Sequence, residues 1–397
     1  MAEREATGNR ARFLRLAHTE RIIGLLRGGP VSRAELQART GLSRATVSAI
    51  VAELRRDGVV ESRPAPAPRT AGPGRPAELI GLAERNARTV GVAFYRDGLR
   101  VALGDALRQI VGVAERPFSR RMGWAERGEV AVDTLRALCA EYDVTLTGVD
   151  GVGVGVVGPV APGRLAGRWR VAVDRLADLV GAPVYVDNNV RLAALAETIW
   201  GAAAGHDSAL YLHIGEGVGG GLILGGRLYR GDSGAAGEFG HVTVDPDGPV
   251  CHCSRRGCLE LYANVPAILS AAGRRGPRAR DVEAGYGLTD TLADPAVAAA
   301  LHRAAGYAGA VVGAALATLD VHHVVVGGLF AAAGEEVRTV FADTVRTRVL
   351  SSVAERLRVV PATLGPPGGA LGAVALVHHS SPLLTGYEPL RHSTPAR

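Results

Sequence analysis

Two glycine-rich groups of strands constrain the fold of this chain more strongly than any other part of its sequence. Residues 89–116 and residues 208–231 each alternate short apolar runs with turn residues, the pattern of neighbouring antiparallel strands. Helical patterns follow both groups, and a further buried strand at residues 322–328 lies between long alanine-rich helices. Strands that alternate with helices pack as α/β layers. We therefore expect an α/β body of two similar lobes that arose by duplication.

The first 58 residues carry a different pattern, that of three short helices. Apolar residues recur at helical spacing over residues 10–28, Ser32 can cap a second helix, and Ser43 can cap a third that ends at Gly58. A turn at Gly41 separates the second helix from the third. These two helices share one apolar seam, formed by Leu36, Leu42, Val47, Ile50, Val51 and Leu54.

The opposite side of the third helix carries polar residues that suit contact with DNA. Ser43, Arg44, Thr46 and Ser48 lie near its front and away from the apolar seam. The N-terminal part of a recognition helix reaches base edges, which hydroxyl and guanidinium groups can read. An ordinary helical hairpin is the alternative interpretation. The seam, the glycine turn and the local charge together favour a helix-turn-helix.

Two short strands, at residues 59–61 and 78–80, flank a stretch rich in proline, alanine, arginine and glycine. Such a stretch can be a linker. Its position between two strands favours the tip of a hairpin wing instead. Arg75 lies between prolines and glycines in this tip, where an extended backbone suits insertion into a narrow minor groove. A solvated loop is the alternative interpretation.

The surplus positive charge also lies at this end of the chain. The formal net charge is +6, and residues 1–85 hold 15 basic and 9 acidic residues, which is the whole excess. This segment is therefore the one in which we expect a polyanion such as double-stranded DNA to bind. A solvated basic face would have the same charge.

The sequence also argues against several classes of protein. No uninterrupted apolar run reaches the ~18 residues of a membrane span, and the first residues lack the apolar core of a signal peptide, so we expect a cytoplasmic protein with no membrane partner. Every basic residue is arginine. The absence of lysine excludes a Walker-type phosphate loop and a Schiff-base mechanism.

One histidine and three cysteines have the spacing of a metal site. His241 is followed by Cys251, Cys253 and Cys258. One imidazole and three thiolates suit tetrahedral zinc in a structural role, because no coordination position stays open for catalysis. His252 is a rival ligand, but it directly follows Cys251 and is less suited to converge on the same ion. The fourth cysteine, Cys139, is expected to be a small buried apolar residue.

Two glycine-rich segments resemble phosphate-binding loops. Gly153, Gly155 and Gly158 satisfy the pattern G-x-G-x-x-G, but the segment runs into proline and opens no helix, so we reject a dinucleotide site. Residues 215–226 can either place backbone amides around a phosphate or form a tight turn between strands.

Together these segments resemble the ROK family of repressors, open reading frames and kinases, and the resemblance covers nearly the whole chain. Residues 226–260 are similar to the family signature and its zinc motif, with Ser254 in place of the usual glycine. Residues 183–197 resemble the sugar-site strand and helix, and residues 324–330 and 371–377 resemble C-terminal segments of the nucleotide lobe. The resemblance implies an actin-like body of two ribonuclease-H-type lobes with a sugar in the cleft. The N-terminal winged helix-turn-helix places the chain in the repressor branch.

The resemblance also implies the residues of the ligand site. Asn188, Glu238, His241 and Glu260 occupy positions that contact sugar hydroxyls, and His241 would bind zinc as well. Carboxylates and amides suit this task because they form paired hydrogen bonds with neighbouring hydroxyls. Together with Asn189, these residues form the set that we expect to bind a ligand.

Several departures from the family pattern argue against kinase activity. Asn189 stands where kinases carry the aspartate that acts as general base, and an amide cannot take a proton. Residues 93–97 replace the phosphate motif D-x-G-G-T, and Glu216 replaces a threonine in the second phosphate motif. Residues 161–169 form a shortened loop that lacks the usual sugar-binding asparagine. The sequence thus predicts a body that has lost its catalytic residues.

We therefore expect a DNA-binding transcriptional repressor whose inactive kinase-like body senses a sugar, a sugar phosphate or a related metabolite. The expected domains are residues 1–84 for DNA binding, 85–190 for the first lobe and 191–397 for the second, with the C-terminal helix returning to the first lobe. A homodimer or a dimer of dimers would bind an inverted-repeat operator. The alternatives are a body that only dimerises or binds a protein, and an active sugar kinase.

Overall fold

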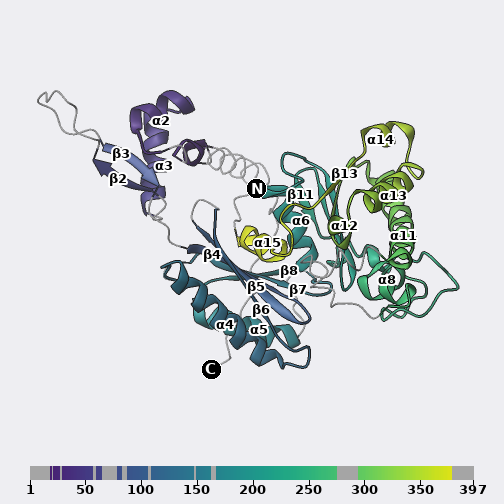
Figure 1. Cartoon of the computed structure of the whole chain (residues 1–397). Coiled ribbons are helices and arrows are strands. Elements are labelled where there is room, and N and C mark those ends of the chain that lie inside the picture. The colour runs from purple at the N-terminus through teal and green to yellow at the C-terminus, as the bar shows by residue number, and fades with distance from the viewer. Residues whose placement is uncertain are drawn as a thin grey trace, which may run out of the picture. The chain divides into compact units, whose positions relative to one another are not determined.

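The computed structural model describes residues 18–19, 21–26, 29–56, 60–64, 78–82, 87–105, 109–146, 149–161, 167–274 and 294–377. The chain divides into two compact units (Figure 1). The N-terminal unit consists of residues 1–87 with residues 104–109, and the body consists of residues 88–103 with residues 110–397.

The N-terminal unit contains the second and third expected helices, and only residues 18–19 and 21–26 of the first, expected over residues 10–28, are among the described residues. Residues 21–26 are helical, and they are followed by α2 (Arg33–Thr40) and α3 (Arg44–Arg56). The Ser32 side chain accepts a hydrogen bond from the Glu35 amide at 3.2 Å, which caps α2. Gly41 ends this helix with a left-handed backbone (φ 70°), which a residue without Cβ adopts at little cost.

A small sheet completes this unit. The strands β1 (Val31–Ser32), β2 (Val60–Pro64) and β3 (Glu78–Leu82) pair antiparallel in the order β1-β3-β2. The expected apolar seam forms part of the core of this unit, where Leu42 is partly buried. The buried residues of this core are Ile22, Leu26, Val31, Leu36, Val47, Ile50, Val51, Leu54, Val60 and Ile80. A winged helix-turn-helix is confirmed. The tip of the β2–β3 hairpin, including Arg75, lies outside the described residues.

The first lobe of the body is built on a five-stranded sheet in the order β6-β5-β4-β7-β8. Its strands are β4 (Ala87–Phe94), β5 (Gly98–Asp105), β6 (Ile110–Pro117), β7 (Gly151–Val156) and β8 (Val184–Asn188). Strand β7 pairs in parallel with both β4 and β8. The helices of this lobe are α4 (Trp124–Glu141), α5 (Gly167–Val180) and α6 (Asn189–Trp200).

The second lobe repeats this plan with the sheet order β11-β10-β9-β12-β13. Its strands are β9 (Ala209–Ile214), β10 (Val218–Leu224), β11 (Arg227–Tyr229), β12 (His323–Gly328) and β13 (Arg358–Pro361). The first three strands pair antiparallel, and β12 lies parallel to both β9 and β13. The two sheets share one strand order, so the expected duplicated α/β body is confirmed.

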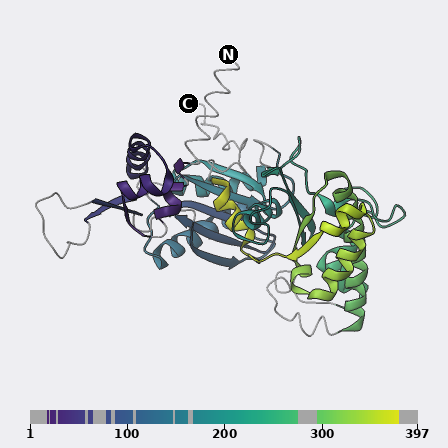
Figure 2. The same cartoon turned by 90° about the horizontal axis from the view of Figure 1, so that it is seen from above.

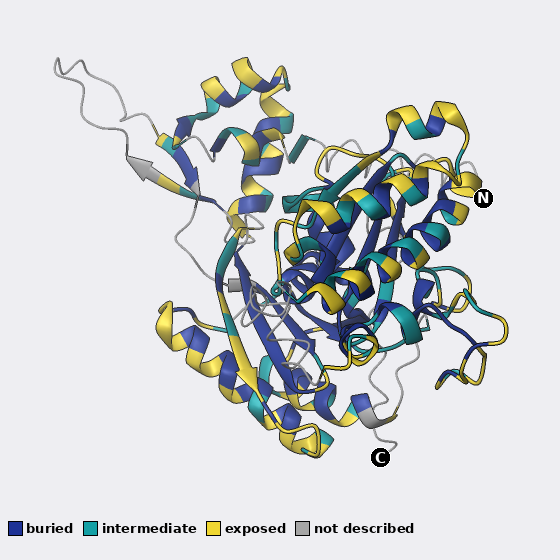
Figure 3. Ribbon diagram, turned by 45° about the vertical axis from the view of Figure 1, so that its right-hand side comes forward, coloured by how far each residue is buried: buried dark blue, intermediate teal, exposed yellow. Residues whose placement is uncertain are grey.

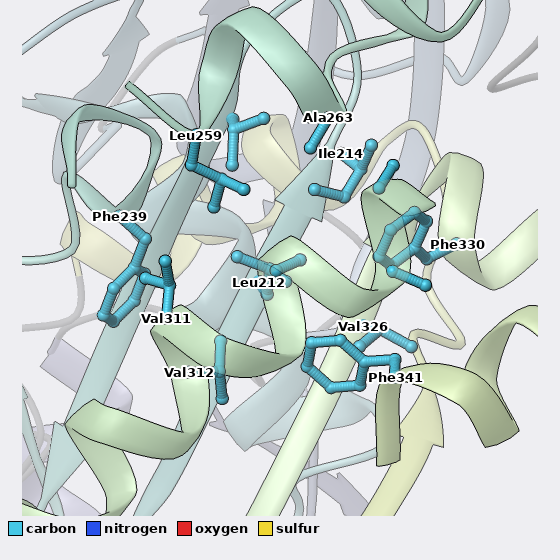
Figure 4. Packing of buried hydrophobic residues seen from close by; sticks show 14 of the residues in the cluster. Leu212, Ile214, Phe239, Leu259, Ala263, Val311, Val312, Val326, Phe330 and Phe341 are labelled. Atoms are coloured by element: carbon cyan, nitrogen blue, oxygen red, sulfur yellow. The ribbon is translucent and has the colours of Figure 1, made fainter. Parts of the chain in front are cut away.

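Helices cover the second sheet and bury its apolar residues. They are α7 (Glu260–Ala263), α8 (Val265–Ala271), α11 (Pro295–Leu319), α12 (Leu329–Ala332), α13 (Glu335–Arg346) and α14 (Ser351–Arg356). Helices of the body turn exposed faces outward over buried strands (Figure 3). In the core of this lobe, Phe330 and Phe341 pack edge to face near Leu212 and Val326 (Figure 4). Among the described residues, no helix is long and apolar enough to span a membrane.

The C-terminal helix α15 (Gly368–Val377) packs against β7 and α6 of the first lobe, where it lies in yellow beside these elements (Figures 1 and 2). Gly153 of β7 explains the close approach, because a Cβ at this position would lie 1.8 Å from the carbonyl oxygen of Ala373. Gly153 and Gly155 of the rejected dinucleotide pattern thus lie in a buried strand, and Gly158 lies in the bend that follows it. Helix α6 begins at Asn189, so the boundary expected at residue 190 falls within its first turn.

His323, the first residue of β12, contacts the turn that follows α6. Its Nε2 donates to the carbonyl oxygen of Ala202 at 2.8 Å, and its ring stacks on His206 at 3.8 Å. The Nδ1 atom is buried with no partner among the described residues. Burial lowers the pKa of His323, and the neighbouring His206 lowers it further.

This histidine should make the body less stable in mild acid. The unfolded chain protonates His323 near its ordinary pKa of ~6.5, whereas the folded chain resists protonation, so stability falls as the pH drops below that value. The slope cannot exceed about 1.4 kcal/mol per pH unit for one proton. In His323→Gln, the amide can still donate to Ala202 but does not titrate. Thermal unfolding between pH 7.5 and 5.5 should therefore show a smaller loss in this variant, and equal losses would contradict the assignment.

Candidate metal centre and ligand cavity

Four side chains of the second lobe converge on one point. His241 ends the short 3-10 helix η1 (Phe239–His241), and Cys251, Cys253 and Cys258 follow in the next loop. Their ligand atoms all lie within 4.8 Å of one another. Cys251 Sγ lies 3.7 Å from His241 Nδ1, and Cys253 Sγ lies 3.5 Å from Cys258 Sγ. Tetrahedral ligands with bonds of ~2.3 Å are ~3.8 Å apart, so the cluster fits a metal ion.

Backbone hydrogen bonds hold this loop in place. The amide of Cys251 donates to the carbonyl of Arg255 at 2.7 Å, and the amide of Ser254 donates to the carbonyl of Cys251 at 2.9 Å. Isolated bridges pair Thr243 with Cys258 and Val250 with Arg256. Ser254 has a left-handed backbone (φ 72°), which explains why the family motif usually has glycine there.

Two thiols of the cluster have shifted pKa values. Burial, together with the neighbouring thiols, raises the pKa of Cys258 to about 12. The backbone of Arg255 is the main cause that lowers the pKa of Cys253. Because thiolates are the ligands, a bound ion must displace the proton of Cys258. The rival ligand His252 is 62% exposed, and its Nδ1 lies 3.3 Å from Glu260 Oε1 and 3.7 Å from Cys251 Sγ; it is outside the group of four whose ligand atoms all lie close together.

A cavity of about 200 Å³ lies beside the metal centre, between the two lobes. The structure brings the five expected ligand residues together in its wall, which includes Asn188, Asn189, Glu238, His241 and Glu260. The two asparagines come from the end of β8 and the start of α6 in the first lobe, and the other three come from the second lobe. A small molecule that fills this cavity would therefore touch both lobes.

The two asparagines have structural tasks that the sequence analysis did not anticipate. Asn188 caps α6, because its Oδ1 accepts from the amides of Val190 and Arg191 at 2.8 and 3.2 Å. Its Nδ2 donates to Gly158 O at 2.9 Å and retains one hydrogen for a ligand. Asn189 donates from Nδ2 to Phe94 O at 2.6 Å, and its buried Oδ1 has no partner among the described residues.

The two glutamates lie on the metal side of the cavity. Glu260 Oε2 accepts from the amide of Val218 at 3.0 Å, which ties the glutamate to the β9–β10 turn. Glu238 Oε2 lies 4.0 Å from His241 Nε2. Burial raises the pKa of Glu238, while His241 and Arg191 oppose this shift. Both carboxylates line the cavity and can accept hydrogen bonds from hydroxyls.

The segments that resemble phosphate motifs form tight turns between strands. The amide of Tyr95 donates to Gly98 O at 2.8 Å, and the amide of Gly215 donates to Gly217 O at 2.9 Å. The Arg100 guanidinium lies over the Tyr95 ring at 4.7 Å and pairs with Glu115 at 3.1 Å. A second cavity of about 260 Å³ shares Tyr95, Arg100 and Asn189 with the first. The bulky side chain of Tyr95 thus stands where the phosphate motif of the family has a glycine.

Arg191 is a site residue that sequence reasoning missed. It is fully buried, and it pairs with Asp187 at 2.6 Å. It also donates to the carbonyls of Gly234 at 2.5 Å and Val160 at 3.2 Å, so it joins two loops from different parts of the chain. The available signal was an arginine within the apolar stretch of α6, four residues after Asp187.

In the N-terminal unit, three of the expected DNA-contacting residues lie on α3, and Ser43 directly precedes this helix. Arg44 and Ser43 are exposed, and Thr46 and Ser48 are half-buried. Ser43 Oγ accepts from the Thr46 amide at 3.1 Å and lies 2.8 Å from Thr46 Oγ1, so these two hydroxyls are already paired with each other. Arg44 is thus the expected residue with the most accessible donors.

Comparison with known proteins identifies relatives of both units. The ROK family profile matches residues 89–380, and the MarR family profile matches residues 21–69. The xylose repressor of Bacillus subtilis strain 168 is 28% identical over 364 residues, which cover 89% of this chain and 92% of the repressor.

Two solved structures are similar as well. A ROK family transcriptional regulator, a homologue of the E. coli MLC protein, has a TM-score of 0.72 at 20% identity, with coverage of 93% of this chain and 96% of its own. A ROK family glucokinase from Streptomyces griseus, solved with glucose and AMPPNP, has a TM-score of 0.61 at 26% identity, with coverage of 72% of this chain and 98% of its own. These likenesses confirm the expected winged helix-turn-helix and actin-like body. Because the family profile matches most of its length, this chain belongs to the ROK family.

Proposed function

We propose that this chain is a transcriptional repressor that binds operator DNA through α3 and responds to a sugar bound in the cavity of its body. The observation that carries the proposal is the joining of a winged helix-turn-helix to a ROK body in one chain. The similarity to the xylose repressor supports it, because that similarity extends over 92% of the repressor.

The cavity favours a small polyhydroxylated ligand. Glu238 and Glu260 offer carboxylate oxygens on one wall, and Asn188 offers an amide hydrogen on the other. The similar glucokinase was solved with glucose, which supports a sugar as the ligand class. The shortened loop at residues 161–169, most of which lies outside the described residues, leaves the identity of the sugar open.

We further propose that the body does not phosphorylate its ligand. The amide of Asn189 cannot take a proton from a sugar hydroxyl, and its Nδ2 is held by Phe94 O. General-base assistance is worth roughly 10²–10⁴-fold in rate. Tyr95 adds bulk to the cavity wall, and Glu216 adds negative charge to it. Both would disfavour a phosphate at this wall. The repressor is therefore a sensor that has kept binding residues without the catalytic base.

Zinc is the metal that we propose for the group of His241, Cys251, Cys253 and Cys258. Three thiolates and one imidazole suit tetrahedral zinc and leave no open position. When bound, the ion would fix the loop between η1 and α7, which ends at Glu260. A structural role follows, because the ion would hold one wall of the cavity.

The operator should be an inverted repeat bound by a homodimer or a dimer of dimers. Two copies of α3 would enter successive major grooves on one face of the duplex, which requires half-sites about 10 base pairs apart or a multiple of that spacing.

Arg44→Ala should weaken binding to this operator by ~1–3 kcal/mol and relax specificity at one base pair, because its exposed guanidinium can read a guanine. Arg44→Lys is the matched control, since it keeps the charge but loses the bidentate fork. Both variants should therefore lose specificity, as measured by fluorescence anisotropy on operator and random duplexes. Equal losses on both duplexes for Arg44→Ala would instead reassign this arginine to phosphate contact. A wild-type chain that distinguishes no duplex sequence would overturn the repressor proposal.

A further inference from the structure

An ion pair joins the two lobes beside the cavity. Arg120 lies in the loop between β6 and α4 of the first lobe, and its Nη2 contacts Glu216 Oε1 in the β9–β10 turn of the second lobe. The side chains are 55% and 22% exposed, so water and salt reach the pair. Glu216 also lines the cavity. The contact thus connects the two walls between which a ligand would lie.

The loop that carries Arg120 is firmly held. Buried Arg127 donates from Nη2 to the carbonyl of Arg120 at 2.9 Å and from Nε to the carbonyl of Met122 at 3.0 Å. Its guanidinium lies over the rings of Phe118 and Trp124, at 4.7 and 4.3 Å. These contacts fix the backbone of the loop, so the Arg120 side chain reaches Glu216 from a fixed point of the first lobe.

The turn that carries Glu216 is tied to the ligand residues. The amide of Val218 donates to Glu260 Oε2 at 3.0 Å, and the amide of Val265 donates to Gly215 O at 2.9 Å. Only Gly217 therefore separates Glu216 from Val218, whose amide Glu260 holds. A hydroxyl that hydrogen-bonds to Glu260 would compete for the carboxylate that positions this turn.

We propose that Arg120 and Glu216 form a latch that holds the two lobes closed over the cavity, and that Glu260 joins this latch to the ligand. An exposed ion pair is weak and is screened by salt, so it can open and close on binding, whereas a buried pair would hold the lobes permanently. The negative charge of Glu216 would repel a bound phosphate, whereas in the latch it has a role because it pairs with Arg120. The latch goes beyond the repressor function, because it describes how the body closes when no sugar is bound.

Hydrogen–deuterium exchange of the full chain, measured by mass spectrometry without DNA or sugar, tests the latch. In Arg120→Glu and in Glu216→Arg, amides of the β9–β10 turn and of the loop before α4 should exchange ~2–5-fold faster, the range set by an exposed ion pair. The double variant Arg120→Glu/Glu216→Arg should restore the wild-type rates, because it rebuilds the pair with its charges exchanged. Added salt near ~1 M, where the Debye length is ~3 Å, should speed exchange in the wild type and in the double variant, and should have no such effect in the single variants, which lack the pair.

Arg136→Glu is the matched control, since Arg136 pairs with Asp133 within α4 and its loss should leave these rates unchanged. Glu216→Gln keeps the shape of the side chain and should loosen the same amides, which guards against a misfolded charge reversal. Wild-type rates in the single variants would overturn the latch, as would a double variant as fast as the single ones. Neither outcome would touch the repressor proposal, which is tested with operator DNA.

Discussion

Cys258→Ser should release the metal and lower the melting temperature of the chain by roughly 8–16 °C. The Cys258 thiol is fully buried and lies 3.5 Å from Cys253 Sγ, so serine would remove one of four ligands from the centre. Loss of an outer-shell partner alone costs ~10–100-fold in affinity, and loss of a ligand should cost more. A metal present at ~1,000 times its Kd stabilises the folded chain by about 4 kcal/mol, and each kcal/mol is worth ~2–4 °C in a large domain.

Elemental analysis and thermal unfolding of purified protein check this prediction. His252→Ala is the matched control, because His252 adjoins Cys251 but lies outside the group of four, and this variant should keep its metal. A chelator should shift the melting temperature of the wild type toward that of Cys258→Ser and leave the latter unchanged. Wild-type protein with well under one zinc ion per chain would contradict the proposed cofactor.

The parts of the fold that local rules determine could be predicted from the sequence. The turn at Gly41 has a left-handed backbone, which favours glycine, and the apolar residues of α2 and α3 lie on one buried side. The turn and the buried side could both be predicted, because each depends on residues that are neighbours in the sequence. The cluster that could hold a metal could be found for the same reason, because three of its four residues lie within eight positions. The cap of α6 also had a local signal in Asn188, which precedes an apolar helix, but the family resemblance drew attention to sugar contact instead.

Contacts between distant segments could not be predicted in this way. Arg120 and Glu216 are separated by 96 positions, and neither residue type has a local reason to pair with the other. Buried Arg191 depends on carbonyls of residues 160 and 234, whose positions are set by the packing of both lobes. The approach of α15 to Gly153 is similar, since a glycine in a strand indicates close backbone contact without naming the partner.

We expect the response of operator binding to sugar to depend on Glu260. It is 9% exposed, lines the cavity and holds Val218, yet it is not among the four metal ligands. In Glu260→Gln, the amide oxygen can still accept from Val218, while the negative charge that would bind a pair of hydroxyls is lost. The variant therefore separates a role in ligand binding from a role in supporting the metal loop.

D-xylose or D-glucose, or one of their phosphates, should change the affinity of the wild-type chain for its operator by ~5–150-fold, the usual range of coupling between two sites. The coupling arises only if the sugar binds the closed and open forms of the lobes with different affinity. Glu260→Gln should keep its metal and melting temperature but lose this response, as measured by anisotropy of a labelled operator with and without each sugar. Loss of metal in this variant would instead show that Glu260 only supports the zinc loop. If none of these sugars shifts either the melting temperature or the operator affinity of the wild type, the body serves dimerisation or protein contact, and the sensor proposal falls while DNA binding by α3 still stands.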